Sequence, residues 1–195
     1  MLFPTAYFPS ILYVQEIAQF KKIELECLES FPKQTIRNRC YILSANGPLC
    51  LSIPIVHSKQ TVLKTKDILF DNSKNWQKNH LRAIKSAYAS SPYFEDYYFD
   101  IEDLLLNNPS NSLLSLNLRI MKKMLGFIDI QIEFNYNSSF SKNEPNRNRN
   151  YFEKEIDAQK YHQVFILKNG FFSNPSFLDL LMNEGPMARN IILKK

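Results

Sequence analysis

The sequence predicts an α+β fold in which a mainly antiparallel N-terminal sheet with a hairpin is packed by a helical middle segment and a C-terminal helix. Three observations predict this class. Residues 23–56 contain short runs that alternate apolar and polar residues, with the pair Asn46-Gly47 between two of them. Residues 76–125 contain three segments with apolar residues at helical spacing. Residues 127–134 alternate again, so strands, helices and a further strand follow one another.

The N-terminal part is expected to begin with a helix and continue with a strand. Ser10 is a suitable N-cap for a helix over residues 10–20, which the chain enters through a Tyr-Phe-Pro corner. Residues 23–28 alternate apolar and acidic residues, which is typical of a strand with one exposed face. Another short strand is expected over residues 65–70.

Strands over residues 38–44 and 49–56 are expected to pair as a hairpin. Both segments are rich in β-forming residues, and Asn-Gly between them is the strongest short-range signal for a two-residue loop. In such a loop Asn46 and Gly47 both have positive φ. Pro54 is expected at a sheet edge or near a strand end, because it cannot donate to a ladder.

The three cysteines are expected to be small buried hydrophobes. Cys27, Cys40 and Cys50 lie in strand-like contexts and outside any metal-ligand spacing. A two-residue hairpin loop places Leu43, not Cys40, opposite Cys50. A Cys40–Cys50 disulfide is therefore disfavoured, in agreement with a reducing compartment.

Helices make up the middle of the chain. Residues 76–89 place apolar side chains on one helical face and lysines on the other. Second and third helices are expected over residues 93–106 and 112–125, and Gly126 ends the third. The alternating residues 127–134 predict a strand.

The C-terminal part is expected to contain a strand over residues 161–166 and a helix over 175–182 that stops at Gly185. A polar, mobile loop is expected over residues 135–155, since connectors of that length are usually functional or mobile. No internal repeat or domain linker interrupts the sequence, so residues 1–195 are expected to form a single domain.

The composition is that of a globular protein. With 195 residues, of which 45% are hydrophobic and 22% charged, the chain is long enough for a well-buried core. The longest apolar runs, such as residues 101–106, fall far short of the roughly 20 residues that span a bilayer. The N-terminus lacks the pattern of a secretory signal, so no transmembrane segment and a cytoplasmic location are expected.

The net charge of +5 and the pI of about 9.0 raise the possibility of a nucleic-acid partner. The only dense polar-basic run, residues 141–150, carries three positive charges and one acid, and no aromatic residue is interleaved on which a base would stack. A solvated loop is the better interpretation, and no nucleic-acid partner is expected.

Several kinds of site are excluded by the sequence. The four glycines do not form a phosphate-binding loop, so a nucleotide cofactor of the usual kind is not expected. The histidines at positions 57, 80 and 162 do not lie at metal-ligand spacing, and no metal or other cofactor is expected. The Gly-x-Ser-x-Gly nucleophile motif is absent.

His80 is the best single candidate for catalysis. It lies on the apolar face of its predicted helix, one turn after Trp76 and one turn before Ile84. Burial there depresses the pKa of the imidazole and leaves it neutral, the state that a general base needs. The alternative is a core histidine that is hydrogen-bonded to a backbone carbonyl or to Tyr88.

The segment Lys33-Gln-Thr-Ile-Arg-Asn-Arg39 is a second candidate site. Its cations and amides suit the binding of a phosphate or carboxylate. In an extended segment Arg37 and Arg39 share one face, so the two side chains are expected to hold one anion together. The alternative is that these charges are solvated, or paired with the glutamates at positions 24, 26 and 29.

Two proline corners complete the candidates. Tyr7 precedes Pro9 near the N-terminus, and Asp179 follows Pro175 near the C-terminus, so polar groups at each corner are positioned for a ligand. The alternative for Asp179 is a role in capping a helix that begins near Ser176.

Four segments carry a resemblance to a known family: Thr5-Ala-Tyr-Phe-Pro9, Lys33-Gln-Thr-Ile-Arg-Asn-Arg39, Trp76-Gln-Lys-Asn-His80 and Asn174-Pro-Ser-Phe-Leu-Asp-Leu-Leu-Met-Asn-Glu-Gly-Pro186. In their order and spacing, from Pro4 to about Pro186, they resemble WbqC-like proteins, a bacterial family often found with genes for O-antigen and other surface polysaccharides. The resemblance implies a carbohydrate context and supports a role for the segment from Trp76 to His80.

The expected function is that of an enzyme of surface-polysaccharide synthesis, a transferase that moves an acyl or aminoacyl group from a donor to an activated sugar, such as a nucleotide-sugar, or a related metabolite. The expected catalytic residues are His80 as base and Tyr88 as donor to a developing oxyanion, a role that Tyr7 also suits. The expected substrate-binding residues are Tyr7, Lys33, Gln34, Arg37, Asn38, Arg39, Trp76 and Asp179. The alternative is a non-catalytic binding protein that recognises a glycan precursor or a partner protein. The sequence does not fix the oligomeric state.

Overall fold

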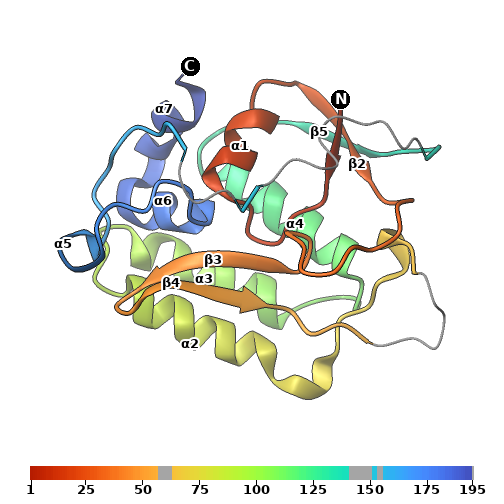
Figure 1. Cartoon of the computed structure of the whole chain (residues 1–195), viewed down its shortest axis with the longest axis horizontal. Helices are drawn as coiled ribbons and strands as arrows, with labels where there is room; N and C mark the ends of the chain where they lie inside the picture. The colour runs from red at the N-terminus through yellow and green to blue at the C-terminus, as the bar shows by residue number, and fades with distance from the viewer. Residues whose placement is uncertain (57–62, 141–150, 153–155, 195) are drawn as a thin grey trace.

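A three-stranded parallel sheet forms one end of the molecule. The computed structural model describes residues 1–56, 63–140, 151–152 and 156–194. Strands β1 (Leu2–Pro4), β2 (Lys22–Glu26) and β5 (Glu133–Tyr136) pair in the order β1-β2-β5, at the top of Figure 1. The α+β class is confirmed, but the expectation of a mainly antiparallel N-terminal sheet is wrong. Helix α1 (Ile11–Ile17) connects β1 to β2 as a crossover, and a crossover returns the chain in the same direction.

The predicted hairpin is present as a separate two-stranded sheet. Strands β3 (Arg39–Ser44) and β4 (Gly47–Ser52) are antiparallel, with Tyr41 opposite Cys50. The loop consists of Ala45 and Asn46, and only Gly47 has positive φ, +95°. The predicted loop is therefore displaced by one residue, and the residue opposite Cys50 changes by two positions, from the expected Leu43 to Tyr41.

The Ser44 side chain explains this turn. Its hydroxyl accepts from the Asn46 N–H at 3.2 Å and donates to the Gly47 carbonyl at 2.7 Å. A turn over Ala45 and Asn46 leaves Gly47 as the residue with positive φ, a conformation that glycine adopts without a steric penalty. The three cysteines are free, but Cys50 is exposed rather than buried.

Three helices form the middle of the fold, as predicted. They are α2 (Trp76–Tyr88), α3 (Phe94–Leu106) and α4 (Leu113–Gly126). Ser112 caps α4, because its hydroxyl accepts from the Ser115 N–H at 3.3 Å. Helix α2 packs on β3 and α3, and α3 packs on α4; in Figure 1 the hairpin crosses in front of α3, with α2 below it.

The C-terminal part is helical. It contains α5 (Ile166–Asn169), the predicted α6 (Phe177–Glu184) and α7 (Ala188–Leu193). Short 3-10 turns occur at Thr65–Asp67, Asn72–Lys74 and Gly185–Met187.

Three predicted strands are wrong or shortened. Residues 65–70 form a 3-10 turn with isolated bridges, and residues 161–166 form no strand. Of residues 127–134, only the end joins β5. Arg189 donates to the carbonyls of Ile128 and Asp129, and Asp129 has a φ of +52°, so the backbone before β5 is not extended.

One hydrophobic cluster includes buried residues from both sheets and from the helices around them. The predicted loop over residues 135–155 falls largely outside the described residues. Within its described part, Tyr151 is buried with its ring 5.0 Å from that of Tyr13. No helix in the described part of the chain has the length and apolar character that a bilayer crossing requires.

Candidate functional site

A pocket lies where the Tyr-Phe-Pro corner meets the first strand of the hairpin and the start of α6. Six aromatic side chains line it: Tyr7, Phe8, Tyr41, Tyr151, Phe152 and Phe172. Among the described residues of the lining, Arg39 carries the only charge. The cavity volume is about 20 Å³, room for roughly one water molecule. A larger ligand therefore requires lining side chains to move.

Backbone hydrogen bonds bring these distant segments together. The Tyr7 N–H donates to the Ile36 carbonyl at 2.9 Å, so the first and second family-like segments touch. The Phe177 N–H donates to the Pro9 carbonyl at 2.7 Å, which joins the first segment to the fourth. Three of the four segments that carried the resemblance thus meet around one pocket.

The corner itself is strained. Phe8 has a φ of +38° although it is fully buried and not glycine. Such a conformation costs about 1–3 kcal/mol and persists only where surrounding contacts enforce it. Strain of this kind is concentrated at functional sites, so Phe8 supports this pocket as the candidate site.

Two helices begin at the pocket. Ser10 caps α1 and Ser176 caps α6, and both serines belong to the lining. The Ser176 hydroxyl accepts from the Leu178 N–H at 3.2 Å, and Asn174 Oδ1 accepts from the Leu12 N–H at 2.9 Å. These N–H groups are satisfied by the protein, so the helices contribute mainly the positive potential of their N-termini.

Arg39 is the cation of the pocket. It is the first residue of β3 and is half-buried, and its Nε is buried without a hydrogen-bond partner. A buried N–H of a guanidinium group that lacks a partner favours an incoming carboxylate or phosphate oxygen.

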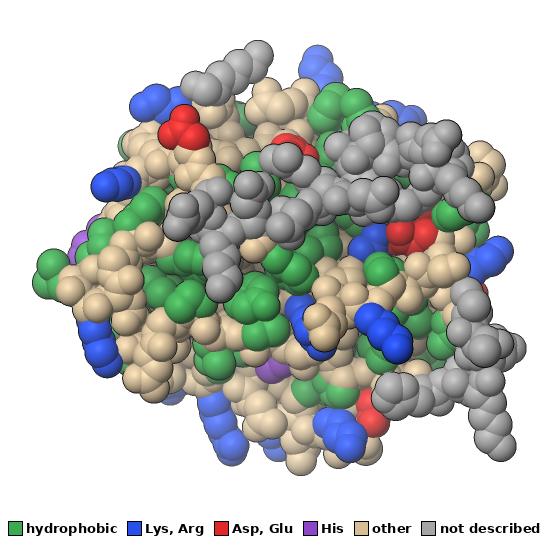
Figure 2. Space-filling model, in the orientation of Figure 1, with side chains coloured by type: hydrophobic (Ala, Val, Ile, Leu, Met, Phe, Trp, Pro, Cys, Tyr) green, Lys and Arg blue, Asp and Glu red, His purple; other side chains and the backbone are tan. Residues whose placement is uncertain are grey.

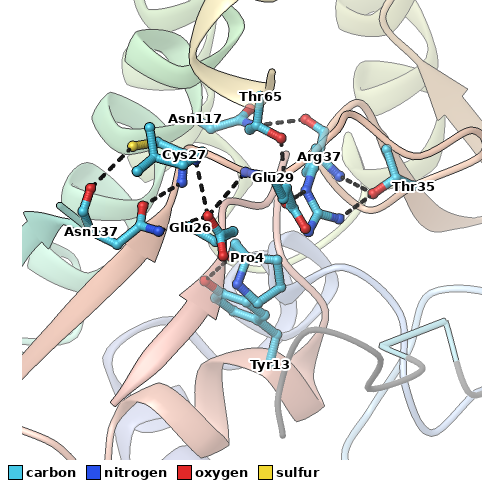
Figure 3. Close-up of polar contacts among 11 residues, drawn as sticks. Pro4, Tyr13, Glu26, Cys27, Glu29, Thr35, Arg37, Thr65, Asn117 and Asn137 are labelled. Carbon is cyan, nitrogen blue, oxygen red and sulfur yellow. Dashed lines mark hydrogen bonds and ion pairs between the residues drawn. The ribbon is translucent and has the colours of Figure 1, made fainter. Parts of the chain in front are cut away.

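Arg37 is committed elsewhere. Its guanidinium forms an ion pair with Glu29, with Nε 2.6 Å from Oε1, and Nη1 donates to Thr35 Oγ1 at 2.6 Å (Figure 3). Burial lowers the pKa of Arg37, and Glu29 opposes that shift. The expected joint clamp by Arg37 and Arg39 is therefore not formed. Residues 36–38 form a turn, so the alternation of an extended strand does not apply to them.

Three further residues of this segment, Lys33, Gln34 and Asn38, also lie outside the pocket lining, whereas Ile36 belongs to it. Asn38 donates through Nδ2 to the Ile53 carbonyl at 3.0 Å. Lys33 and Gln34 are exposed and do not belong to the lining. Asn117 on α4 donates to the Arg37 carbonyl at 2.7 Å and fixes the turn from behind (Figure 3).

His80 lies behind the pocket and reaches it through Tyr7. Its Nδ1 is 2.7 Å from the Tyr7 hydroxyl, and Trp76 packs edge-on with ring centroids 5.2 Å apart. Burial lowers the pKa of His80 to about 4, and a hydrogen bond to the Ser52 carbonyl opposes this shift. A neutral imidazole has one N–H, and that hydrogen bond uses it. Nδ1 is then the acceptor and the Tyr7 hydroxyl is the donor.

Tyr88 and Asp179 belong to a second buried cluster. Asp179 Oδ1 accepts from the Tyr161 hydroxyl at 2.7 Å and from Gln163 Nε2 at 3.1 Å. Burial raises the pKa of Asp179 to about 6, against hydrogen bonds from Tyr161, Tyr88 and Gln163. The Asp179 side chain is not a helix cap, because the N–H of Ser176 is taken by the Tyr41 carbonyl at 2.7 Å.

This cluster supports one wall of the pocket. Gln163 donates to the Phe172 carbonyl at 2.9 Å and accepts from the Phe172 N–H at 3.0 Å, so it holds that backbone from both sides. Phe172 in turn lines the pocket. Asp179 therefore acts on the pocket indirectly, and neither it nor Tyr88 belongs to the lining.

The predicted site residues are thus partly brought together. Tyr7 and Arg39 line the pocket, and His80 and Trp76 lie directly behind Tyr7. Sequence reasoning did not single out Cys40, Tyr41, Tyr151, Phe152 and Phe172, which also line it. Aromatic residues of this kind look like core residues in a sequence, and only the arrangement of the strands shows that they face a cavity.

Comparison with known proteins gives a family. The model of the WbqC-like protein family matches residues 5–162, so three of the four family-like segments fall within the match. A protein of Mycobacterium tuberculosis (strain ATCC 25618 / H37Rv), described as uncharacterized protein Rv1507c, is 22% identical over 213 residues, which cover 93% of this chain and 89% of the relative. No solved structure matches the chain. The chain belongs to the WbqC-like protein family.

Proposed function

We propose that this protein is an enzyme that transfers an acyl or aminoacyl group to an activated sugar or a related metabolite during synthesis of a bacterial surface polysaccharide. The carbohydrate context rests on the resemblance to WbqC-like proteins. The observation that carries the chemistry is the 2.7 Å contact between His80 Nδ1 and the hydroxyl of Tyr7, a residue of the pocket lining. The proposed reaction takes place in the cytoplasm.

Tyr7 and His80 form a proton relay in this proposal. As the amine or hydroxyl of the acceptor bonds to the acyl carbon, its proton moves to the Tyr7 oxygen, and the proton of Tyr7 moves to His80 Nδ1. Collapse of the intermediate breaks the bond from the acyl carbon to the leaving group. The proton then returns through Tyr7 to that group. Because the pKa of His80 is about 4, the imidazole holds the proton only transiently.

Arg39 is proposed to hold the anionic part of the substrate. It carries the only charge among the described lining residues, and its buried Nε lacks a partner. The aromatic side chains of the lining offer faces for a sugar or nucleobase ring. The N-termini of α1 and α6 add positive potential at the same place.

The second candidate is a non-catalytic binding protein that recognises a glycan precursor or a partner protein. Both ring nitrogens of His80 have protein partners, Tyr7 and Ser52, which is also what a structural histidine requires. In that case the same pocket binds a ligand and no bond is made or broken.

The two candidates are separated by an assay on the whole chain. The protein is incubated with a UDP-linked amino sugar and acetyl-CoA, and mass spectrometry detects acylated sugar while calorimetry detects binding. Under the enzyme proposal, Tyr7→Phe and His80→Asn each lower turnover by about 10²-fold or more. Activity persists from neutral pH down to about pH 4 and falls where His80 takes up a proton.

The matched control is Tyr98→Phe on α3, which removes a half-buried tyrosine hydroxyl from outside the pocket lining. This variant should turn over like the original protein. Binding without any product, or equal turnover of Tyr7→Phe and Tyr98→Phe, would remove the relay. The binding-protein candidate would then be the better account.

A further inference from the structure

Helix α2 exposes a basic face. Lys78, Arg82 and Lys85 are exposed along the helix, and Lys74 continues the row in the preceding turn. The helix contains no acidic residue. Figure 2 shows Lys and Arg side chains along the lower edge of the molecule, where α2 lies in Figure 1.

Helix α3 exposes an acidic face. Glu95, Asp96 and Asp103 are exposed, and Glu102 is half-buried. The helix contains no basic residue. Near its middle, Phe99 is 66% exposed, which is unusual for a residue of that size on a charged helix face.

The two faces belong to neighbouring antiparallel helices. Only residues 89–93 connect α2 to α3, and the helices pack on each other (Figure 1). Their opposite charges do not neutralise each other, because none of the ion pairs found among the described residues joins α2 to α3. The molecule therefore shows a positive and a negative strip side by side, each 13 residues long.

The positive strip on α2 beside the negative strip on α3 indicates which kind of partner can bind here. Nucleic acid or an anionic bilayer would be attracted to α2 and repelled by α3. A partner that suits both strips must present both signs in the same arrangement. We propose that the α2–α3 face binds the α2–α3 face of a second copy of this chain, around a twofold axis parallel to the helices. That axis lays α2 of each copy on α3 of the other, so opposite charges meet twice.

The positions along the helices agree with this axis. Rotation about an axis parallel to the helices leaves the position of each residue along that axis unchanged, so residues at equal distances from the α2–α3 connection meet. Lys85 then meets Glu95 and Asp96 of the second copy, and Lys78 meets the acidic end of α3 near Asp103. Arg82, at the midpoint of α2, meets the exposed ring of Phe99, a favourable arrangement of cation and aromatic face.

The face is small, so the dimer is weak. Two helices of 13 residues, each about 20 Å long at 1.5 Å per residue, cover on the order of 400 Å² on each copy. That area is typical of transient complexes, and the interaction is mainly electrostatic. We expect a monomer–dimer equilibrium in the micromolar range or weaker at low salt, and monomer at high salt.

Charge reversal tests the proposal by sedimentation velocity at about 5–200 μM protein in about 50 mM and 500 mM NaCl, on either side of physiological screening. Lys78→Glu/Arg82→Glu removes the net positive charge of the α2 strip, and Glu95→Lys/Asp103→Lys removes the net negative charge of the α3 strip. Each double variant should be monomeric alone. Mixed in equal amounts at low salt, the two should form a heterodimer, because each then offers the strip that the other lacks. Circular dichroism verifies that both variants are folded.

The control separates this geometry from attraction by net charge. Lys21→Glu/Lys122→Glu changes two exposed lysines outside α2 and α3 and gives the same net charge as the α2 variant. It should dimerise like the original protein and should not pair with the α3 variant. A monomeric original protein at 200 μM and low salt, no heterodimer in the mixture, or equal pairing by the control would each overturn the proposal.

Discussion

His80 and Asp179 are expected to give this protein two opposed dependences of stability on pH. Burial favours the neutral form of both groups, but a histidine becomes neutral by losing a proton and a carboxyl by gaining one. The pKa of His80 falls from 6.5 to about 4, and that of Asp179 rises from 3.8 to about 6. Both groups therefore change charge between about pH 4 and 6.5, with opposite effects on the free energy of unfolding.

The sign for each group follows from linkage. The folded state of His80 resists protonation, so its contribution to stability is present above pH 6.5 and is lost as the pH falls through about 4. Asp179 holds its proton more tightly when folded, so its contribution is present below pH 3.8 and is lost as the pH rises through about 6. At 1.36 kcal/mol per pKa unit, each change amounts to about 3 kcal/mol. In the original protein the two changes nearly cancel.

Single substitutions remove the cancellation. Urea unfolding of the original protein, His80→Asn and Asp179→Asn is followed by circular dichroism at intervals from pH 4 to pH 7. Each variant is compared with the original protein at the same pH, because this difference removes the titration of all groups that they share. The unfolding free energy of His80→Asn relative to the original protein should rise by about 3 kcal/mol from pH 7 to pH 4. That of Asp179→Asn should fall by about 2–3 kcal/mol over the same range.

The double variant serves as the internal control. It lacks both titrations, so its pH dependence should resemble that of the original protein, although its stability is lower or higher by a constant amount. Curves for the single variants that run parallel to the original protein, or that slope in the same direction, would refute the reasoning about burial at both sites.

Three further predictions concern stability and are measured by chemical unfolding. Glu29→Gln should lower the free energy of unfolding by about 3–5 kcal/mol, because it leaves the Arg37 charge buried and unpaired. Glu29→Gln combined with Arg37→Met should recover part of this loss, because the double variant has no buried charge at this place. Equal stability of the single and double variants would contradict the prediction. Gly47→Ala should lower the free energy of unfolding by about 1 kcal/mol, because Gly47 has a positive φ, while Asn46→Ala should change it by less than about 0.5 kcal/mol. A larger loss for Asn46→Ala than for Gly47→Ala would favour the loop first expected from the sequence. Ser176→Ala should lower the free energy of unfolding by about 1 kcal/mol through the lost helix cap, and Ser176→Gly by less; equal stability of Ser176→Ala and the original protein would contradict this.

The sequence predicts the helices well because their signals are local. The apolar spacing in α2 and the serine caps before α4 and α6 lie within or next to the helices that they specify. Strand partners are not local. Strand β1 has three residues and ends in proline, and nothing near it in the sequence shows that it pairs with β2 across a helix. Residues 127–132 alternate like a strand, but Arg189 from α7, about sixty positions away, holds their carbonyls.

The candidate site is predicted only where a segment carries its own signal. Tyr7 and Arg39 belong to the family-like segments and line the pocket. Gln163, which holds the wall at Phe172, lies in a segment that reads as a strand. Its role depends on Asp179, and the sequence contains no pattern that connects the two positions.

The two arginines show how position decides the role of chemically identical side chains. Arg37 lies in a turn and pairs with Glu29 at 4% exposure, whereas Arg39 begins β3 and enters the pocket. A buried ion pair contributes little net stability compared with an apolar contact of the same volume, so stability alone does not account for it. Its contacts with Thr35 and Thr65 instead tie the loop before β3 to the rest of the fold (Figure 3). That loop sets the point at which β3 begins, and β3 sets the direction of Arg39. Arg37 therefore acts on the pocket without touching it, and a ligand held by Arg39 should bind more weakly after Arg37→Met even in protein that remains folded.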